Sequence, residues 1–520
     1  MKHKFLTIAI FFISFLSGIL FFGAKYFKFG LSIEQLLFVF AFPITGTNDA
    51  ITAMIVKEVL VQVICPSALL AVFMVLLPKI LHSKLAGKIY NLTQNLLREI
   101  MAKSLKFSLC VSVCLFILAF SFADSRLKFS AMIENHFFKP YSNFYEENYI
   151  TPNASDFTKP KNARNLIVII VESLESTFSA ANIPPSAQRF TQNGFAQNGG
   201  GGQNDSSQKS HYSPHGELIP NLTHFAQNGV NFSANSTLGG HLPNVGSSVT
   251  IQATISYFCG FPNIFPKGGI ERAKGRYFSN ATCIGNILDL LGYNQAVFTG
   301  ADGGFGGYSQ FIKNQHFSEF DVRYFRAQGY IPQDYRTAWG IEDAKLFSFA
   351  KKYLESYDKK EPFALYISTV DTHFPVFVDK AFCADLDLNY KNAFKCSDRI
   401  ISDFVRFVQD SHFGKNTSIV IVGDHLSMER DFVPPNTKRY IYNAFINPRF
   451  SVNPSFELVK NRSLTHYDIT ALILDSLGFQ VKAFGLGRNP LYGKTLIEEY
   501  GLENFNELIT QPSKVYESFW

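Results

Sequence analysis

Hydrophobic residues are concentrated in three long runs within the first 124 residues of the chain. The runs cover residues 5–24, 59–78 and 107–123, and none of them contains a charged side chain. Runs of about 17 to 25 apolar residues are long enough to cross a bilayer as a helix, and Pro66 is tolerable inside such a helix. A signal peptide is the alternative for the first run, but no clear cleavage site follows it. We therefore expect three membrane-spanning helices.

Basic residues flank these runs unevenly. Lys2 and Lys4 precede the first run, and six further cations lie between the second and the third: Lys79, Lys84, Lys88, Arg98, Lys103 and Lys106. By the positive-inside rule both regions are cytoplasmic, so an odd number of spans places everything after Asp124 on the outer side. Residues 36–45 are too short to span alone, and we interpret them as interfacial or re-entrant. If they spanned, the large domain would lie in the cytoplasm.

The remainder of the chain alternates between two patterns. Four short apolar runs, typical of strands buried on both faces of a parallel sheet, cover residues 165–171, 294–300, 362–369 and 417–423. Helical patterns lie between them, at 283–292, 343–357 and 397–410. This alternation predicts an α/β sandwich with a mostly parallel central sheet. We expect a membrane domain at 1–124, a connector at 125–160 and an outer domain at 161–520, with a low-complexity surface loop at 193–214.

The charge distribution argues against nucleic-acid binding, and the cysteine content allows two disulfides. The net charge of +6 owes much to the basic flanks of the membrane runs, and the outer domain has no basic stripe interleaved with aromatics that would indicate nucleic-acid binding. Seven cysteines are present, four of them in the outer domain. An oxidising compartment permits two disulfides there, and of the three possible connectivities we prefer Cys259–Cys283 and Cys383–Cys396. No Cys-x-x-Cys spacing supports a zinc ribbon.

Polar residues follow three of the four predicted strands. Glu172 follows the first, Asp371 and His373 follow the third, and Asp424 and His425 follow the fourth. Each has an ordinary structural explanation, because a carboxylate favours a helix start and Asp-His pairs are common in turns. The carboxyl ends of parallel strands meet at one edge of a sheet, however, and carboxylates with imidazole suit Mn²⁺, Zn²⁺ or Mg²⁺. Together they predict a metal site.

Seven segments, in order along residues 161–495, resemble those of the phosphoglycerol transferase I family. They are NLIVIIVESLESTF, IPNLTHFAQNGVNF, VGSSVTIQATISYFCGFP, AWGIEDAKLF, VDTHFPVF, VGDHLSM and FGLGRNPLYGKTL. More broadly the chain is similar to lipoteichoic acid synthases and the alkaline phosphatase/sulfatase superfamily. The resemblance implies a multi-pass protein of the bacterial inner membrane, with its catalytic domain in the periplasm. Such an enzyme moves phosphoglycerol from phosphatidylglycerol to a periplasmic glucan or another glycan.

The same resemblance implies roles for individual residues. Glu172, Thr250, Asp424 and His425 correspond to the ligands of one divalent ion, for which Mn²⁺ is expected and Mg²⁺ or Zn²⁺ are alternatives. Thr250 corresponds to the nucleophile, and Trp339 and His373 to residues that bind the substrate head group. His373 is also a candidate acid, whereas Asp371 is expected to be structural. The chain has GSSVT where the family pattern has a second Thr and a Trp, which leaves substrate choice open.

The chemistry of these residues suggests a two-step reaction. Thr250 lies where a helix is expected to begin, near Val249, so coordination by a cation and the positive helix end would both favour its alkoxide. Attack on the lipid phosphodiester would release diacylglycerol and leave phosphoglyceryl-threonine, which an acceptor hydroxyl then attacks. The structural alternative is that Thr250 caps this helix.

Three other functions are alternatives to this one. Sulfatase activity needs a Cys or Ser that becomes formylglycine, and Gln252 and Thr254, with no following Arg, do not fit that motif. A phosphoethanolamine transferase acting on lipid A or a glycan remains open, since His241 and His466 could serve as additional zinc ligands. A non-catalytic binding or sensor domain would be expected to have lost some ligands, and none is missing.

Overall fold

The structure is a computed structural model that describes residues 2–26, 49–86, 94–157, 159–160, 162–182, 217–265, 277–335, 339–429, 433 and 437–520. These residues form two compact units, one ending at Phe138 and the other running from Lys139 to Trp520. Residues 36–45 and the loop at 193–214 lie outside the described residues.

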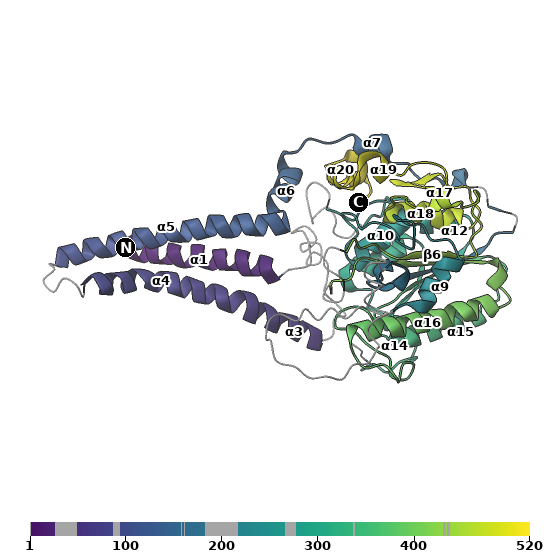
Figure 1. Cartoon of the computed structure of the whole chain (residues 1–520), viewed down its shortest axis with the longest axis horizontal. Helices are drawn as coiled ribbons and strands as arrows, with labels where there is room; N and C mark the ends of the chain where they lie inside the picture. Colours follow the sequence, from purple (N-terminus) through teal and green to yellow (C-terminus); the bar gives the residue numbers. More distant parts are fainter. Residues whose placement is uncertain are drawn as a thin grey trace, which may run out of the picture. The chain divides into compact units, whose positions relative to one another are not determined.

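The N-terminal unit is helical. Its elements are α1 (Lys2–Tyr26), α3 (Asp49–Val59), the π-helical turn η1 (Leu60–Ile64), α4 (Cys65–Ala86), α5 (Gln94–Leu127), α6 (Phe129–Ile133) and the π-helical turn η2 (Glu134–Phe138). Helix α1 packs against both α4 and α5 (Figure 1). Three stretches, 3–26, 52–80 and 103–127, are long and apolar enough to cross a membrane. The predicted set of three apolar helices is therefore present.

A six-stranded sheet is the centre of the second unit. Its strands are β1 (Asn165–Val171), β2 (Asn294–Thr299), β3 (Ser318–Phe320), β4 (Phe363–Ser368), β5 (Thr417–Gly423) and β6 (Asn443–Ile446). The strand order is β3-β2-β4-β1-β5-β6, and only β6 runs antiparallel to its neighbour. β1 pairs with β4 on one side and β5 on the other, in parallel. The mostly parallel α/β fold is thus confirmed.

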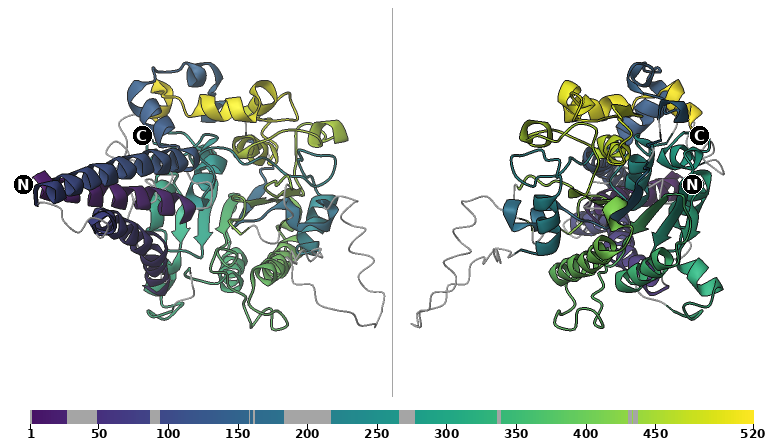
Figure 2. Two further views of the ribbon diagram at one scale, coloured as in Figure 1. Left: turned by 60° about the vertical axis from the view of Figure 1, so that its left-hand side comes forward. Right: turned by 90° about the vertical axis from the view of Figure 1, so that its right-hand side faces the viewer.

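Helices cover both faces of this sheet. In Figure 2 the green helices α14 to α16 lie on one side of the sheet, and the yellow C-terminal helices lie on the other. The helices are α7 (Phe144–Asn148), α9 (Pro220–Asn228), α10 (Thr250–Cys259), α12 (Ile284–Leu290), α13 (Tyr308–Asn314), α14 (Val322–Ala327), α15 (Asp343–Glu355), α16 (Tyr390–Asp410), α17 (Phe456–Val459), α18 (His466–Asp475), α19 (Leu496–Tyr500), α20 (Leu502–Ile509) and α21 (Lys514–Ser518). A small hairpin, β7 (Ala483–Phe484) and β8 (Gly487–Arg488), packs on α18. Strands β1, β4 and β5 are almost wholly buried, as their continuous apolar sequences require.

The segment expected to be a connector packs partly into the second unit. The Tyr145 hydroxyl is buried and donates to the Ile509 carbonyl at 3.0 Å, and Ile150 forms an antiparallel bridge with Gly485. Phe157 is also buried. Residues 144–157 therefore contribute to the core of the C-terminal unit.

Two disulfides and one close backbone contact connect segments of the second unit. Disulfides join Cys259 to Cys283 and Cys383 to Cys396, the connectivity preferred from the sequence. At Gly423, a Cβ atom would lie 1.9 Å from the Leu174 carbonyl oxygen. Only glycine lets the end of β5 approach the loop after β1 this closely.

Candidate active site

The candidate site lies where β1 ends between β4 and β5. Glu172 is the first residue after β1, and its N–H donates to Thr369 Oγ1 just beyond β4 at 3.0 Å. Thr372 Oγ1 donates back to the Glu172 carbonyl at 2.6 Å. On the other side, the Ser173 N–H donates to Asp424 Oδ1 at 2.7 Å. The three strand ends are thus fastened together around Glu172, as the order of the strands predicts.

Glu172, Asp424 and His425 form a cluster that could hold a metal ion. One ligand atom from each lies within 4.8 Å of the others, and all three side chains are buried. His425 Nε2 is 3.5 Å from Glu172 Oε1 and 3.4 Å from Asp424 Oδ2. His425 Nδ1 lies 3.0 Å from the Leu426 carbonyl, so it is the donor nitrogen, and the Nε2 lone pair is available to a metal.

Thr250 belongs to the same cluster. It is the first residue of α10, and its hydroxyl donates to Glu172 Oε2 at 2.9 Å. Val249 occupies the N-cap position and makes no side-chain hydrogen bond that would cap the helix. The alternative that Thr250 is a helix cap is therefore wrong, because its hydroxyl points at the carboxylate rather than back at its own helix.

The electrostatics of the cluster suit a cation. Burial opposes protonation of His425, but Asp424 and Glu172 outweigh it and raise the pKa of the imidazole. Burial and then repulsion by Glu172 raise the pKa of Asp424 to about 8. Burial would raise the pKa of Glu172 too, but His425 and His373 lower it below its usual value. Without a metal, a proton must balance these two buried carboxylates.

The donor set fits a divalent ion. Asp424 Oδ2 is buried and accepts no hydrogen bond from any residue that the structure describes, which is costly for a carboxylate oxygen unless a cation binds it. Two carboxylates, an imidazole and a hydroxyl are ligands that Mn²⁺, Mg²⁺ and Zn²⁺ accept. Glu172, Asp424, His425 and Thr250 would hold such an ion.

Trp339 and His373 lie together beside this cluster. Their ring centroids are 4.0 Å apart, and the His373 imidazole is close enough to Glu172 to lower the pKa of that carboxyl. The Trp339 indole N–H is buried without a hydrogen-bond acceptor in the described structure. An anionic or hydroxyl-bearing group bound beside His373 would supply one.

His241 and His466 make contacts that differ from those of metal ligands. His466 Nε2 donates to the Asp424 carbonyl at 2.6 Å, and His241 Nε2 lies 2.9 Å from the Tyr257 hydroxyl. Burial lowers the pKa of His466 to about 3 and that of His241 well below its usual value, so both rings are neutral. In the described part of the chain they support the backbone beneath Asp424 instead of adding a second metal site.

Comparison with known proteins places this fold in a family. Residues 164–449 match the sulfatase family, which is more than half of the chain. The chain belongs to the sulfatase family. It is also 30% identical over 287 residues to phosphoglycerol transferase I of Xanthomonas campestris, and 28% identical over 292 residues to phosphoglycerol transferase I of Salmonella choleraesuis. These matches cover 53% and 54% of this chain but only 39% and 37% of the relatives, so the chain spans well under half of their length.

Two solved structures are similar to this sulfatase-family chain at low sequence identity. An alkaline phosphatase superfamily protein from Vibrio parahaemolyticus has a TM-score of 0.47 and 16% identity, with 70% of this chain and 80% of that one covered. The lipoteichoic acid synthase LtaP from Listeria monocytogenes has a TM-score of 0.46 and 17% identity, with 67% and 81% covered.

Two supporting groups in this sulfatase-family site were not foreseen from the sequence. Ser173 has a positive φ of 58°, and its hydroxyl donates to Glu172 Oε1 at 2.8 Å. Glu175, fully buried, accepts from the Ser427 N–H at 2.8 Å and forms an ion pair with Arg439. Glu175 was visible in the ESLE motif, but its partner is 264 residues away, and no local pattern points to it.

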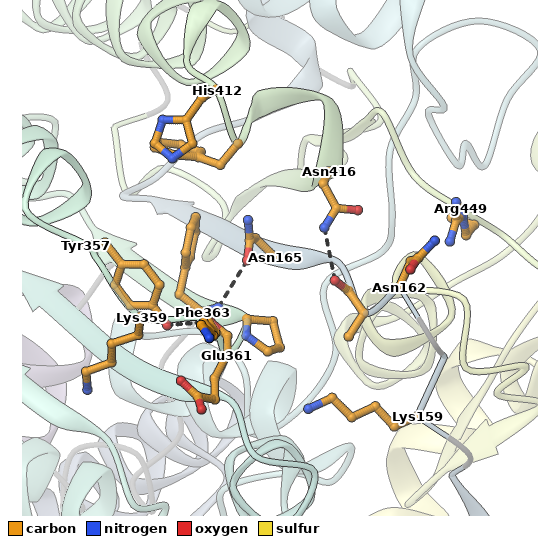
Figure 3. A pocket seen from close by; sticks show the side chains of 14 residues that line it. Lys159, Asn162, Asn165, Tyr357, Lys359, Glu361, Phe363, His412, Asn416 and Arg449 are labelled. Atoms are coloured by element: carbon orange, nitrogen blue, oxygen red, sulfur yellow. Dashed lines mark hydrogen bonds between the residues drawn. The ribbon is translucent and has the colours of Figure 1, made fainter.

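A separate cleft lies at the opposite, amino edge of the same sheet. It has a volume of about 730 Å³ and opens around the starts of β1 and β4 (Figure 3). Asn165 and Phe363 begin those strands, and the Phe363 N–H donates to Asn165 Oδ1 at 3.2 Å. The lysines that line the cleft are exposed to solvent, and so is Arg449. It contains no nucleophile paired with a metal-ligand set, so we place the chemistry at the carboxyl edge.

Proposed function

We propose that the chain is a membrane-anchored, metal-dependent transferase that moves phosphoglycerol from phosphatidylglycerol to a glycan. The observation that carries this proposal is the 2.9 Å hydrogen bond from Thr250 Oγ1 to Glu172, within a buried cluster completed by Asp424 and His425. The similarity to phosphoglycerol transferases supports the choice of phosphoglycerol, and the three apolar helices support an inner-membrane location with the catalytic unit in the periplasm. Mn²⁺ is the ion we expect.

Before the first step the Thr250 hydroxyl gives up its proton to solvent, and the resulting Thr250 alkoxide then attacks the phosphorus of the lipid diester. A divalent ion bound to the cluster would lower the pKa of the hydroxyl and neutralise phosphoryl charge. The N-terminus of α10 adds a positive potential at Thr250. The bond from phosphorus to the diacylglycerol oxygen breaks, and His373 donates a proton to that oxygen, so diacylglycerol leaves.

In the second step, an acceptor hydroxyl attacks the phosphorus of phosphoglyceryl-threonine. The bond from phosphorus to Thr250 Oγ breaks and leaves the Thr250 alkoxide, and the proton of the acceptor hydroxyl passes to neutral His373, which restores the protonated His373 and the alkoxide that began the first step. Trp339 packs against His373 and would orient the glycerol head group through its buried indole N–H.

The adduct on Thr250 tests this function. The full chain in detergent would be incubated with phosphatidylglycerol or phosphatidylethanolamine and Mn²⁺, and peptide mass spectrometry would search for a modified Thr250. We expect a phosphoglycerol adduct and release of diacylglycerol, both lost in Thr250→Ala. Thr254→Ala is the matched control, because Thr254 lies on the same helix and its hydroxyl donates to the Thr250 carbonyl.

Two outcomes would overturn the proposal. A phosphoethanolamine adduct would change the substrate to phosphatidylethanolamine. Activity retained by Thr250→Ala, with no adduct from either lipid, would exclude the covalent mechanism.

A further inference from the structure

Two buried aspartates face each other beside the candidate site. Asp371 lies three residues after β4, and Asp343 is the first residue of α15. Their exposed fractions are 4% and 0%. The Asp343 N–H donates to Asp371 Oδ2 at 3.0 Å, while Asp343 accepts from the Val370 N–H at 2.8 Å and from the Asp371 N–H at 3.4 Å. Each carboxyl therefore holds the backbone of the other segment.

No cation balances these two carboxyls among the described residues. The charged groups that shift the two pKa values most are Glu172 and Glu342 for Asp343, and Asp343, Glu342 and Asp379 for Asp371, all of them acidic. Lys345 instead forms an ion pair with Glu342 at 3.0 Å. Two like charges in a buried site cannot both be stable, so one carboxyl keeps its proton at neutral pH.

The hydrogen bonds identify which carboxyl keeps it. Asp343 accepts through both oxygens, Oδ1 and Oδ2, as an ionised carboxylate does. Among the described residues, Asp371 accepts only through Oδ2, and its Oδ1 is buried without a partner. The proton therefore belongs on Asp371 Oδ1. Burial and then the charge of Asp343 raise the pKa of Asp371 well above its ordinary value, which agrees with this assignment.

Asp343 and Asp371 belong to the two segments that carry the aromatic pair. Trp339 lies four residues before Asp343, His373 lies two residues after Asp371, and the two rings are 4.0 Å apart. We propose that Asp343 and neutral Asp371 form a carboxyl pair that positions Trp339 and His373 to bind the substrate head group. The role of the two rings rests on the proposed function, whereas the connection between the segments does not. Both aspartates are positioning residues, since neither contacts the reacting atoms.

Loss of the Asp371 proton should separate the two segments. Above neutral pH, two adjacent buried carboxylates would repel each other, and the Trp339–His373 contact would loosen. Activity should then fall on the alkaline side, and the environment of Trp339 should change over the same pH range.

Tryptophan fluorescence tests the connection without substrate or metal. The chain has only two tryptophans, Trp339 and Trp520. In full-length Trp520→Phe, studied in detergent with chelator, Trp339 emission and its quenching by acrylamide would be followed from pH 7 to pH 10. We expect quenching to increase as pH rises, and to stay constant when Asp371→Asn is added. If Trp520→Phe does not fold, the difference between the wild type and Trp339→Phe gives the same signal.

Amide substitutions test which oxygens are used. In Asp371→Asn the amide oxygen still accepts from the Asp343 N–H and no proton is required, so this variant should keep most of the activity at pH 7 and extend it to higher pH. Asp371→Ala should lose at least tenfold in kcat/KM. Asp343→Asn should be similarly impaired, because its amide would present an NH₂ group to a backbone N–H. Asp379→Asn is the control, since it removes a nearby charge outside the pair. The pH at which its activity falls on the alkaline side should differ only slightly from that of the wild type.

Two results would overturn the proposal. In the first, acrylamide quenching of Trp339 fluorescence has the same pH dependence in Trp520→Phe with and without Asp371→Asn. In the second, Asp343→Asn is as active as Asp371→Asn. If the chain transfers no phosphoglycerol at all, the proposed function fails, while the fluorescence result still decides on the carboxyl pair.

Discussion

Protonation of individual ligands should control metal binding. Asp424 has a pKa of about 8 and His425 a raised pKa, so at pH 7 the metal-free cluster holds protons that a cation must displace. We expect at least one proton to be released per ion bound at pH 7, and an apparent affinity that rises up to about pH 8. Calorimetry in two buffers of different ionisation enthalpy measures this number. Binding without proton release at pH 7 would contradict the prediction.

Ser173 should contribute to metal affinity without contacting the metal. Its hydroxyl orients Glu172 Oε1, and such supporting bonds are worth about 10- to 100-fold in metal affinity. We expect Ser173→Ala to weaken Mn²⁺ binding by about tenfold. Ser411→Ala is the control, because the Ser411 hydroxyl donates to the Val408 carbonyl at the end of α16 and is not part of the metal cluster. Equal affinities for the two variants would show that Ser173 has no such role.

At the scale of elements, one ion pair joins the loops after β1 and β5. Glu175 is completely buried, and Arg439 donates to it at 2.9 Å and to the Ser427 carbonyl at 2.7 Å. Removing one partner of a buried pair leaves an uncompensated charge and costs about 3 to 5 kcal/mol. We expect Arg439→Met to lower the thermal midpoint of the chain strongly, and Glu175→Gln added to it to recover part of the loss.

An exposed ion pair provides the comparison for that variant. Arg399 bonds Asp385 at 2.6 Å, but both side chains are substantially exposed to solvent. Exposed pairs contribute about 1 kcal/mol or less, so Arg399→Met should lower the midpoint only slightly. Comparable losses in Arg399→Met and Arg439→Met would mean that burial of Glu175 is not the cause.

Elements buried on both faces were the ones that the sequence could predict. β1, β2, β4 and β5 appear as continuous apolar runs, whereas the edge strand β3 is three half-exposed residues, Ser318–Phe320, without a recognisable period. Helix α16 begins at Tyr390, seven residues before the predicted start at 397. Its cap, Asn389, was present in the sequence and accepts from the Asn392 N–H.

The candidate site could likewise be predicted only in part from the sequence. Glu172, Asp424 and His425 follow strands that share one edge, so the order of strands alone brings them together. Thr250 required the family resemblance, because nothing in its own helix indicates that Glu172 lies 2.9 Å away. Asp343 and Arg439 were not singled out, since their importance depends on pairings between segments distant in the sequence, and one sequence does not reveal such pairings.

At the scale of the whole molecule, several buried carboxyls make stability depend on pH. Burial raises the pKa of Asp343 and of Asp468 to about 7, and that of Asp424 to about 8. An unfolded aspartate has a pKa of about 3.9, so the folded chain binds more protons over the interval between. The stabilisation from these protonated carboxyls is complete below about pH 4 and is lost as pH rises through 7 to 8.

A bound cation should reduce the loss of stability at high pH, because it replaces the proton on Asp424 and binds the cluster only in the folded chain. We therefore expect the thermal midpoint of the full chain with chelator to fall steadily between pH 5.5 and pH 9. With saturating Mn²⁺ the midpoint should fall less, and the two curves should diverge most above pH 7, where metal no longer competes with protons. Differential scanning fluorimetry in detergent measures both curves. Asp424→Asn should bring them together, whereas a midpoint that rises with pH in chelator would show that the buried carboxyls are ionised in the folded chain.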